Sequence, residues 1–212
     1  MKAKQVMVMA VVVAASALII VVTTVSGSFA AFPARMGTSQ SVVTKIIPLS
    51  SSEISMLTYM REEEKLARDV YLSMYQKWSD GTFSNIANCE QKHADTLKKF
   101  LDKYNLSDPF QDVIGVFTNS DLQGKYDQLL LVGSQSYIGG LYVGATIEEI
   151  DMIDIQHAID VTTHIDLINS YQNLLEGSKR HLNAYVKALS AQGVIYTPQF
   201  ISQEFYDAIL GL

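Results

Sequence analysis

Six side chains of the kinds that bind transition-metal ions stand near the middle of four apolar segments: Glu64, Glu90, His93, Glu148, Asp151 and His181. Glu90 and His93 are three residues apart, which on a helix places a carboxylate and an imidazole about 5–6 Å apart on one face. Burying several carboxylates is unfavourable unless a counter-charge is present. Two divalent cations would balance the four carboxylates of this set. The spacing therefore predicts a buried site for two metal ions.

The types of these ligands indicate which metal the site would bind. Carboxylates and imidazoles without a thiolate suit iron or manganese better than structural zinc. The chain has a single cysteine, Cys89, which excludes an internal disulfide framework, a zinc ribbon and an iron–sulfur cluster. We therefore expect two iron ions as the cofactor, with manganese as the alternative.

Four long segments with helical periodicity carry the candidate ligands, over about 53–78, 83–104, 141–163 and 166–191. All four prolines of the chain stand outside these segments, as helix interiors require. Steps of three and four residues along each segment select apolar or aromatic side chains, except near mid-length, where the candidate ligands stand. The pattern predicts an all-α fold whose four helices bring these polar groups to one level. Glu149 would replace Glu148 if the third segment were rotated by one residue.

The connections between the four predicted helices differ in length. The first and the last need only a few residues, so each should join two antiparallel helices. Residues 105–140 form the middle connection, which is long enough to run the length of a bundle and has a short helical patch at about 122–132. The third helix should therefore run parallel to the second, giving two antiparallel hairpins joined by a long crossover.

Glu64 and Tyr71, followed by Glu90-x-x-His93, resemble the first half of the di-iron site of ferritin, bacterioferritin and rubrerythrin. More narrowly, motifs spread over about residues 53–207 resemble an uncharacterised ferritin-like family, domain of unknown function 2202. These motifs are residues 63–71, 83–87, 147–151, 177–181 and 198–204. The resemblance implies a ferritin-like four-helix bundle. It also places Tyr71 beside the metal ions as the candidate catalytic residue, while core packing with a paired hydroxyl is the alternative role.

Ser178 departs from the superfamily pattern, in which a second Glu-x-x-His stands on the fourth helix. Here the residue three positions before His181 is a serine. Asp151 can supply the missing carboxylate from the third helix, because it shares a helix face with Glu148. Glu176 is the other available donor, although it lies about 140° round the helix from His181.

The N-terminal residues have the composition of an export signal or a membrane anchor. Lys2 and Lys4 precede an uncharged, largely apolar run from 6 to 25, and small residues follow it. A run of this length can also span a bilayer. Residues 1–30 are therefore predicted to be a signal peptide or a retained membrane anchor, and residues 31–49 a flexible tether. Either alternative places the domain outside the cytoplasm, secreted or anchored to the outer face of the membrane.

The charge of the chain argues against nucleic acid as a partner. The formal net charge is −6, and residues 31–212 carry 14 basic and 22 acidic side chains, a net charge of −8. An acidic domain binds phosphate backbones poorly. With 48% hydrophobic and 18% charged residues, the composition is typical of a globular protein. Residues 50–212 are long enough for one domain with its own core.

The sequence thus predicts an exported or membrane-anchored ferritin-like protein with a di-iron carboxylate centre. Glu64, Glu90 and His93 would hold one ion, and Glu148, Asp151 and His181 the other. The expected chemistry is oxidation of Fe(II) by oxygen or peroxide, or reduction of peroxide, so metal ions and these oxidants are the expected partners. Assembly into a homodimer stays open. The alternative function is a non-enzymatic surface or stress protein that binds metal weakly or not at all.

Overall fold

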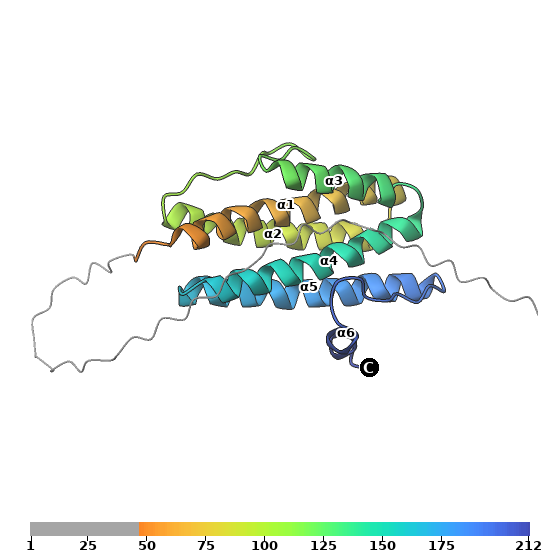
Figure 1. Cartoon of the computed structure of the whole chain (residues 1–212). Coiled ribbons are helices and arrows are strands. Elements are labelled where there is room, and N and C mark those ends of the chain that lie inside the picture. The colour runs from red at the N-terminus through yellow and green to blue at the C-terminus, as the bar shows by residue number, and fades with distance from the viewer. Residues whose placement is uncertain (1–46) are drawn as a thin grey trace, which may run out of the picture. The chain divides into compact units, whose positions relative to one another are not determined.

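The computed structural model describes residues 47–212 as a bundle of helices (Figure 1). The helices are α1 (Ser51–Trp78), α2 (Gly81–Lys103), α3 (Ser120–Gly133), α4 (Tyr137–Val161), α5 (Ile165–Ala191) and α6 (Gln203–Leu210). Residues 47–212 contain no β-strand. The expected all-α fold is therefore observed, and the four long helices begin and end within four residues of the predicted segments.

The predicted signal peptide or membrane anchor, residues 1–30, lies outside the described residues, as does most of the predicted tether. Within residues 47–212, no helix is both long enough and apolar enough to cross a membrane. The role of residues 6–25 as an export signal or a membrane anchor remains a prediction from the sequence.

Local signals set the ends of the first two helices. Ser50 accepts the N–H of Glu53, whose carboxylate accepts the N–H of Ser50 in return, so the predicted capping box forms. At the other end of α1, Ser79 adopts the left-handed conformation with φ 55°. Asp80 then accepts the N–H of Thr82 and starts α2. The turn between the two helices is therefore tight, and they form an antiparallel hairpin.

Contacts between helix ends give the directions of the other helices. Glu53, near the start of α1, accepts hydrogen bonds from Thr162 and Thr163 at the end of α4. Lys103, at the end of α2, pairs with Asp166 at the start of α5. α1 therefore runs antiparallel to α4, and α2 antiparallel to α5, so α2 and α4 are parallel. These directions are the ones that the long middle connection predicted.

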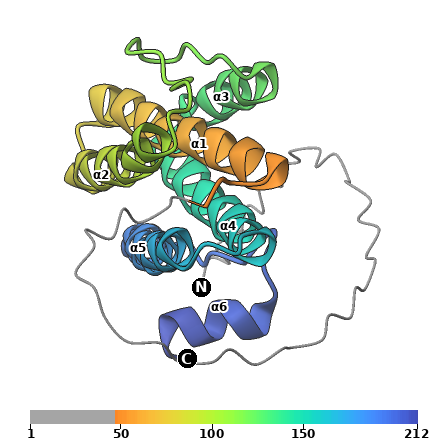
Figure 2. The same cartoon turned by 90° about the vertical axis from the view of Figure 1, so that its left-hand side faces the viewer.

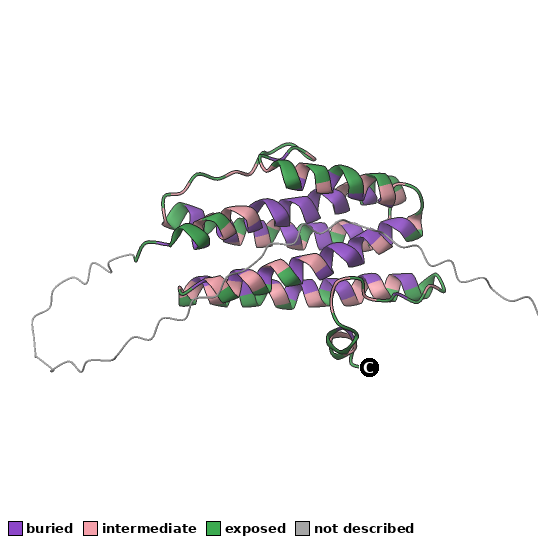
Figure 3. Ribbon diagram, viewed as in Figure 1, coloured by how far each residue is buried: buried purple, intermediate pink, exposed green. Residues whose placement is uncertain are grey.

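The crossover between α2 and α4 is fixed to the outer face of α1. Glu62 accepts the backbone N–H groups of Thr118 and Asn119, and Asp69 accepts that of Gly115. α3 then packs against α1 and α4 (Figure 2). Residues 60–71 of α1 are consequently buried on every side (Figure 3). The crossover thus replaces solvent on a helix face that carries many charged side chains.

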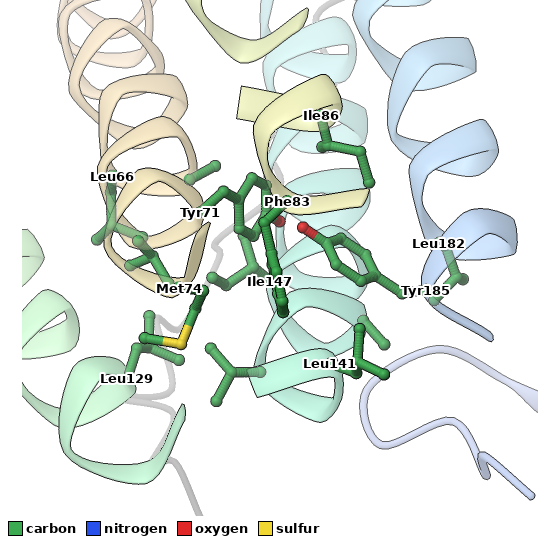
Figure 4. Close-up of a cluster of buried hydrophobic side chains, with 14 of the residues drawn as sticks. Leu66, Tyr71, Met74, Phe83, Ile86, Leu129, Leu141, Ile147, Leu182 and Tyr185 are labelled. Atoms are coloured by element: carbon green, nitrogen blue, oxygen red, sulfur yellow. The ribbon is translucent and has the colours of Figure 1, made fainter. Parts of the chain in front are cut away.

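Two apolar clusters fill the bundle on either side of its polar middle. One cluster contains Tyr71, Phe83 and Tyr185 (Figure 4). The other contains Leu57 and Leu101. In each of the four long helices, the candidate ligands stand between residues of the first cluster and residues of the second. The two clusters therefore bury a layer of polar side chains and fix its position along the bundle.

Candidate metal centre

Glu90 belongs to two groups of ligand atoms in the middle of the bundle. In the first group, Glu90 and His93 of α2 lie next to Glu64 of α1. In the second group, Glu90 lies next to Glu148 of α4 and His181 of α5. Within each group, one ligand atom from each residue lies within 4.8 Å of the others. The four long helices thus bring five of the six predicted ligands together.

The ring nitrogens of the two histidines approach the carboxylates closely. Nδ1 of His93 lies 2.7 Å from Oε2 of Glu90 and 3.3 Å from Oε2 of Glu64. Nδ1 of His181 lies 2.8 Å from Oε1 of Glu90 and 3.5 Å from Oε2 of Glu148. The two imidazole rings are stacked, with their centroids 5.7 Å apart. Glu90 therefore stands between two histidines, each of which faces one further carboxylate.

Several of these buried atoms have no hydrogen-bond partner among the described residues. They are both carboxylate oxygens of Glu64, Oε1 of Glu90, and Nδ1 of His93 and of His181. The short N···O distances therefore lack the alignment of an N–H···O hydrogen bond. Buried polar atoms are nearly always paired, so a group of unpaired ones needs an explanation. Nitrogen and oxygen atoms that lie close together without bonding one another fit the ligand set of a metal ion.

The carboxylates keep both histidines protonated at neutral pH in the metal-free protein. Burial by itself lowers the pKa of His93, but Glu64 and Glu90 outweigh burial and raise this pKa to about 11. Burial also opposes protonation of His181, while Glu148 and Glu90 raise its pKa to about 12. A bound metal ion would have to displace these protons. Metal affinity should therefore increase as the pH rises.

The three carboxylates of the centre differ in their protonation. Burial raises the pKa of Glu64 to about 7, although His93 acts in the opposite direction. Burial also raises the pKa of Glu148 to about 7, and the charge of Glu90 adds to this effect. For Glu90, His181 and His93 outweigh burial and lower the pKa to about 2. Glu90 is thus ionised between the histidines, whereas Glu64 and Glu148 take up protons near neutral pH.

Tyr71 lies beside the second ligand group. Its hydroxyl donates a 2.6 Å hydrogen bond to Oε1 of Glu148. Its ring packs against that of Tyr185, with the centroids 5.3 Å apart (Figure 4). Burial and the charge of Glu148 raise the pKa of Tyr71 well above its usual range. Tyr71 is therefore a buried core residue whose hydroxyl is paired with a candidate metal ligand.

Asp151, the sixth predicted ligand, lies outside both ligand groups. It is buried, and Ser178 donates a 2.6 Å hydrogen bond to its Oδ2. Its Oδ1 has no hydrogen-bond partner within the part of the chain that the structure describes. Burial, together with the charges of Glu64 and Glu148, raises the pKa of Asp151 well above its usual range. Asp151 therefore interacts electrostatically with the carboxylates of the centre, and its role as a metal ligand stays a prediction.

The two alternative carboxylates of the sequence, Glu149 and Glu176, have other partners. Glu149 is fully buried and accepts hydrogen bonds from the Tyr196 hydroxyl and from the backbone N–H groups of residues 199–201. It thereby anchors the segment that leads to α6. Glu176 is exposed and pairs with Lys179. Neither of them faces the ligand groups, so Glu148 is the inward-facing residue of the pair in α4.

Two glycines beside the centre were not among the candidates from the sequence. A Cβ atom at Gly177 would lie 2.6 Å from Cε1 of His93, and one at Gly144 would lie 2.4 Å from the ring of Tyr185. Both glycines stand inside long helices, where glycine is unfavourable. A glycine inside a predicted long helix is the sequence signal that could have identified them. Gly177 makes room for the ring of His93, and Gly144 makes room for the ring of Tyr185, which packs against Tyr71.

The chain is similar to a known protein family over nearly all of its described residues. Residues 53–211 match the family described as an uncharacterized protein domain, DUF2202. The chain is 46% identical over 164 residues to an uncharacterized protein of Methanocaldococcus jannaschii, covering 77% of this chain and 89% of that protein. The crystal structure of a hypothetical protein from Methanococcus jannaschii is similar with a TM-score of 0.77 and 45% identity, covering 79% of this chain and 96% of that one. The predicted resemblance is confirmed: the chain belongs to the DUF2202 family.

Proposed function

We propose that the chain is a ferritin-like protein that binds two transition-metal ions, in the first place iron, at the centre between the four long helices. The observation that carries this proposal is the set of buried, unpaired ligand atoms on Glu64, Glu90, His93 and His181, unpaired among the described residues. The parallel arrangement of α2 and α4 across a long crossover supports the ferritin-like topology. The ligand types suit iron or manganese.

The two ligand groups define which residues would hold each ion. Glu64, Glu90 and His93 would bind one ion, and Glu90, Glu148 and His181 the other, with Glu90 shared between them. Bound iron would supply one-electron redox chemistry with oxygen or peroxide. The two apolar clusters exclude bulk water from both ends of the centre. The chain thus offers an acidic site shielded from bulk water, in which Glu64, Glu90 and Glu148 would offset three of the four positive charges of two divalent ions.

Tyr71 is the residue that we propose as catalytic beside the ions. Its hydroxyl holds Oε1 of Glu148 at 2.6 Å, which orients that carboxylate and gives Tyr71 a proton acceptor. Oxidation of a buried tyrosine requires such an acceptor, because the phenol must lose its proton when it gives up an electron. The arrangement therefore supports either a positioning or a redox role for this side chain.

We further propose that the protein works outside the cytoplasm, secreted or anchored through residues 6–25. The basic start and the apolar run of the N-terminus support this location. A reporter enzyme that is active only after export, fused after residue 212 of the full chain, would be active if this location is right.

Anaerobic loading of the full chain with ferrous iron tests the metal centre. We expect two ions per chain. Addition of oxygen or peroxide should oxidise the bound Fe(II), and the loss of chelatable Fe(II) measures this oxidation. Glu90→Gln should abolish binding of both ions, because both ligand groups contain Glu90. Glu176→Gln, the matched control on an exposed carboxylate, should retain both. A wild-type chain that binds no metal would favour a non-enzymatic helical bundle instead.

A further inference from the structure

A second polar cluster lies between α1 and α4, apart from the two ligand groups of the centre. The Tyr59 hydroxyl lies 3.2 Å from Oε1 of Glu63 and 3.2 Å from Oδ2 of Asp154. Two carboxylates and a phenol oxygen therefore meet at one place on the helix pair. Carboxylate oxygens are ligands that hard divalent cations prefer.

Glu63 is the residue that indicates a ligand at this cluster. Its side chain is buried, with a relative exposure of 4%, and its Oε2 has no hydrogen-bond partner among residues 47–212. A buried carboxylate oxygen without a partner is costly. Glu63 also directly precedes Glu64, so the cluster adjoins the metal centre along the chain. Asp151 on α4 likewise has one carboxylate oxygen, Oδ1, without a hydrogen-bond partner in the described part of the chain.

The side chains of α4 connect the cluster to the centre. Glu148, Asp151, Asp154 and His157 follow one another at intervals of three residues. Because three residues turn a helix by about 300°, each step moves the row about 60° round the helix. The row therefore starts on the inner face and ends near the outer face. Burial follows the same course: Glu148 and Asp151 are buried, whereas Asp154 and His157 are partly exposed.

A groove on the surface reaches the outer end of this row. It has a volume of about 620 Å³, and Tyr59, Asn119 and His157 are among the residues that line it. Tyr59 thus borders the groove while its hydroxyl contacts both carboxylates of the cluster. Lys125 of α3, which is partly exposed, places its ammonium group 2.9 Å from the same hydroxyl. A positive charge accordingly already stands beside the cluster.

We propose that Tyr59, Glu63 and Asp154 form a loading site for divalent cations, from which an ion passes by Asp151 to the metal centre. This inference rests on the proposed function. The two carboxylates supply fewer oxygen ligands than the six or more that hard cations prefer. Binding should therefore be weak and exchange fast, as transfer requires. The acidic row would raise the local cation concentration and the rate of loading.

Stopped-flow loading of the metal-free full chain with Co²⁺, in the absence of oxygen, separates transfer from final binding. Asp154→Asn and Glu63→Gln should each slow loading by about tenfold, the lower end of the effect of electrostatic steering on association rates. The final number of bound ions should stay at two. Asp160→Asn is the matched control, because Asp160 lies on the same helix, is exposed and loses the same charge. Its loading rate should equal that of the wild type.

Lys125→Met provides a test that leaves the buried carboxylates intact. Removing the ammonium group from the Tyr59 hydroxyl should speed loading, because it removes a positive charge that repels incoming cations. An unchanged or slower rate in this variant contradicts the loading site. Equal rates for Asp154→Asn and Asp160→Asn, with two ions bound, would overturn the route but leave the metal centre standing. A wild-type chain that binds no Co²⁺ and no Fe²⁺ at equilibrium would overturn both proposals.

Discussion

Ser178 donates a 2.6 Å hydrogen bond to Asp151, across the interface between α5 and α4. The hydroxyl satisfies one oxygen of this buried carboxylate, and the other oxygen has no partner within the described chain. Burial and the charges of Glu64 and Glu148 raise the pKa of Asp151 well above its usual range. The pair thus holds an additional acidic group of α4 against α5, at the position three residues before His181.

Asp151→Asn should therefore have opposite effects on the metal-free and the metal-bound protein. The metal-free chain should become more stable, because Asp151 must take up a proton when it is buried beside Glu64 and Glu148, whereas asparagine is neutral in the folded and the unfolded chain. Metal affinity should fall by more than about tenfold, since the charge that balances the second ion is reduced. Thermal melting and metal titration measure the two effects. Equal metal affinity in Asp151→Asn and in Glu176→Gln would show that Asp151 takes no part in binding.

Gly177→Ala should disable the first ligand group without unfolding α5. A Cβ atom at this position would lie 2.6 Å from the His93 ring, so the ring must leave the position in which it faces Glu64 and Glu90. Alanine favours a helix by about 1 kcal/mol relative to glycine, which offsets part of the strain. We expect metal titration to show one ion instead of two, with the helical content in circular dichroism unchanged.

Gly124→Ala is the control for this glycine substitution. A Cβ atom at Gly124 in α3 would meet no atom within 4 Å. The variant should therefore keep both ions and gain up to about 1 kcal/mol in free energy of unfolding. If Gly177→Ala also kept both ions, the ring of His93 would not depend on the close approach of α5.

The metal-free protein should lose stability as the pH rises from about 5 to about 9. The pKa of Glu64 and that of Glu148 rise from 4.5 in the unfolded chain to about 7, and that of His93 rises from 6.5 to about 11. Groups whose pKa is raised by folding stabilise the protein fully below their unfolded pKa, and this contribution is lost as the pH passes through the folded value. Glu90, whose pKa falls to about 2, acts in the other direction only below about pH 4.5.

Chemical unfolding at several pH values would measure this dependence. Bound metal should reverse it, because metal ions compete with protons for the same ligands and bind more tightly at high pH. A metal-free protein whose stability increases from about pH 5 to about pH 9 would contradict the proton uptake that we assign to the centre.

Glu148→Gln and Glu149→Gln should separate metal binding from anchoring of the C-terminal segment. Glu149→Gln leaves one carbonyl oxygen for the Tyr196 hydroxyl and three backbone N–H groups, which should cost about 2–4 kcal/mol of stability. It should expose the segment after Tyr196 to limited proteolysis while both ions still bind. Glu148→Gln should have the reverse effect, losing the second ion and keeping the segment protected. The same result for both variants would contradict this division of roles.

The sequence by itself determined the helices and the level of the polar layer. Capping residues such as Ser50 and Asp80 act on backbone groups two or three residues away, so the ends of α1 and α2 are local properties. The polar positions at mid-length follow from helical periodicity, which is local as well. Glu90-x-x-His93 faces the centre for the same reason, since the spacing of three fixes both side chains to one helix face.

Only the tertiary structure decided between Glu148 and Glu149. Residues 143–149 of α4 are all buried. The sequence of this stretch therefore has no polar, solvent-facing side from which the rotation of the helix could be predicted. The choice depends on distant partners: Tyr71 and His181 face one carboxylate, and the C-terminal segment supplies donors to the other. The bonding of Asp151 to Ser178 is likewise a contact between two helices. Such contacts join residues far apart in the chain, and their geometry exists only once the helices have packed together.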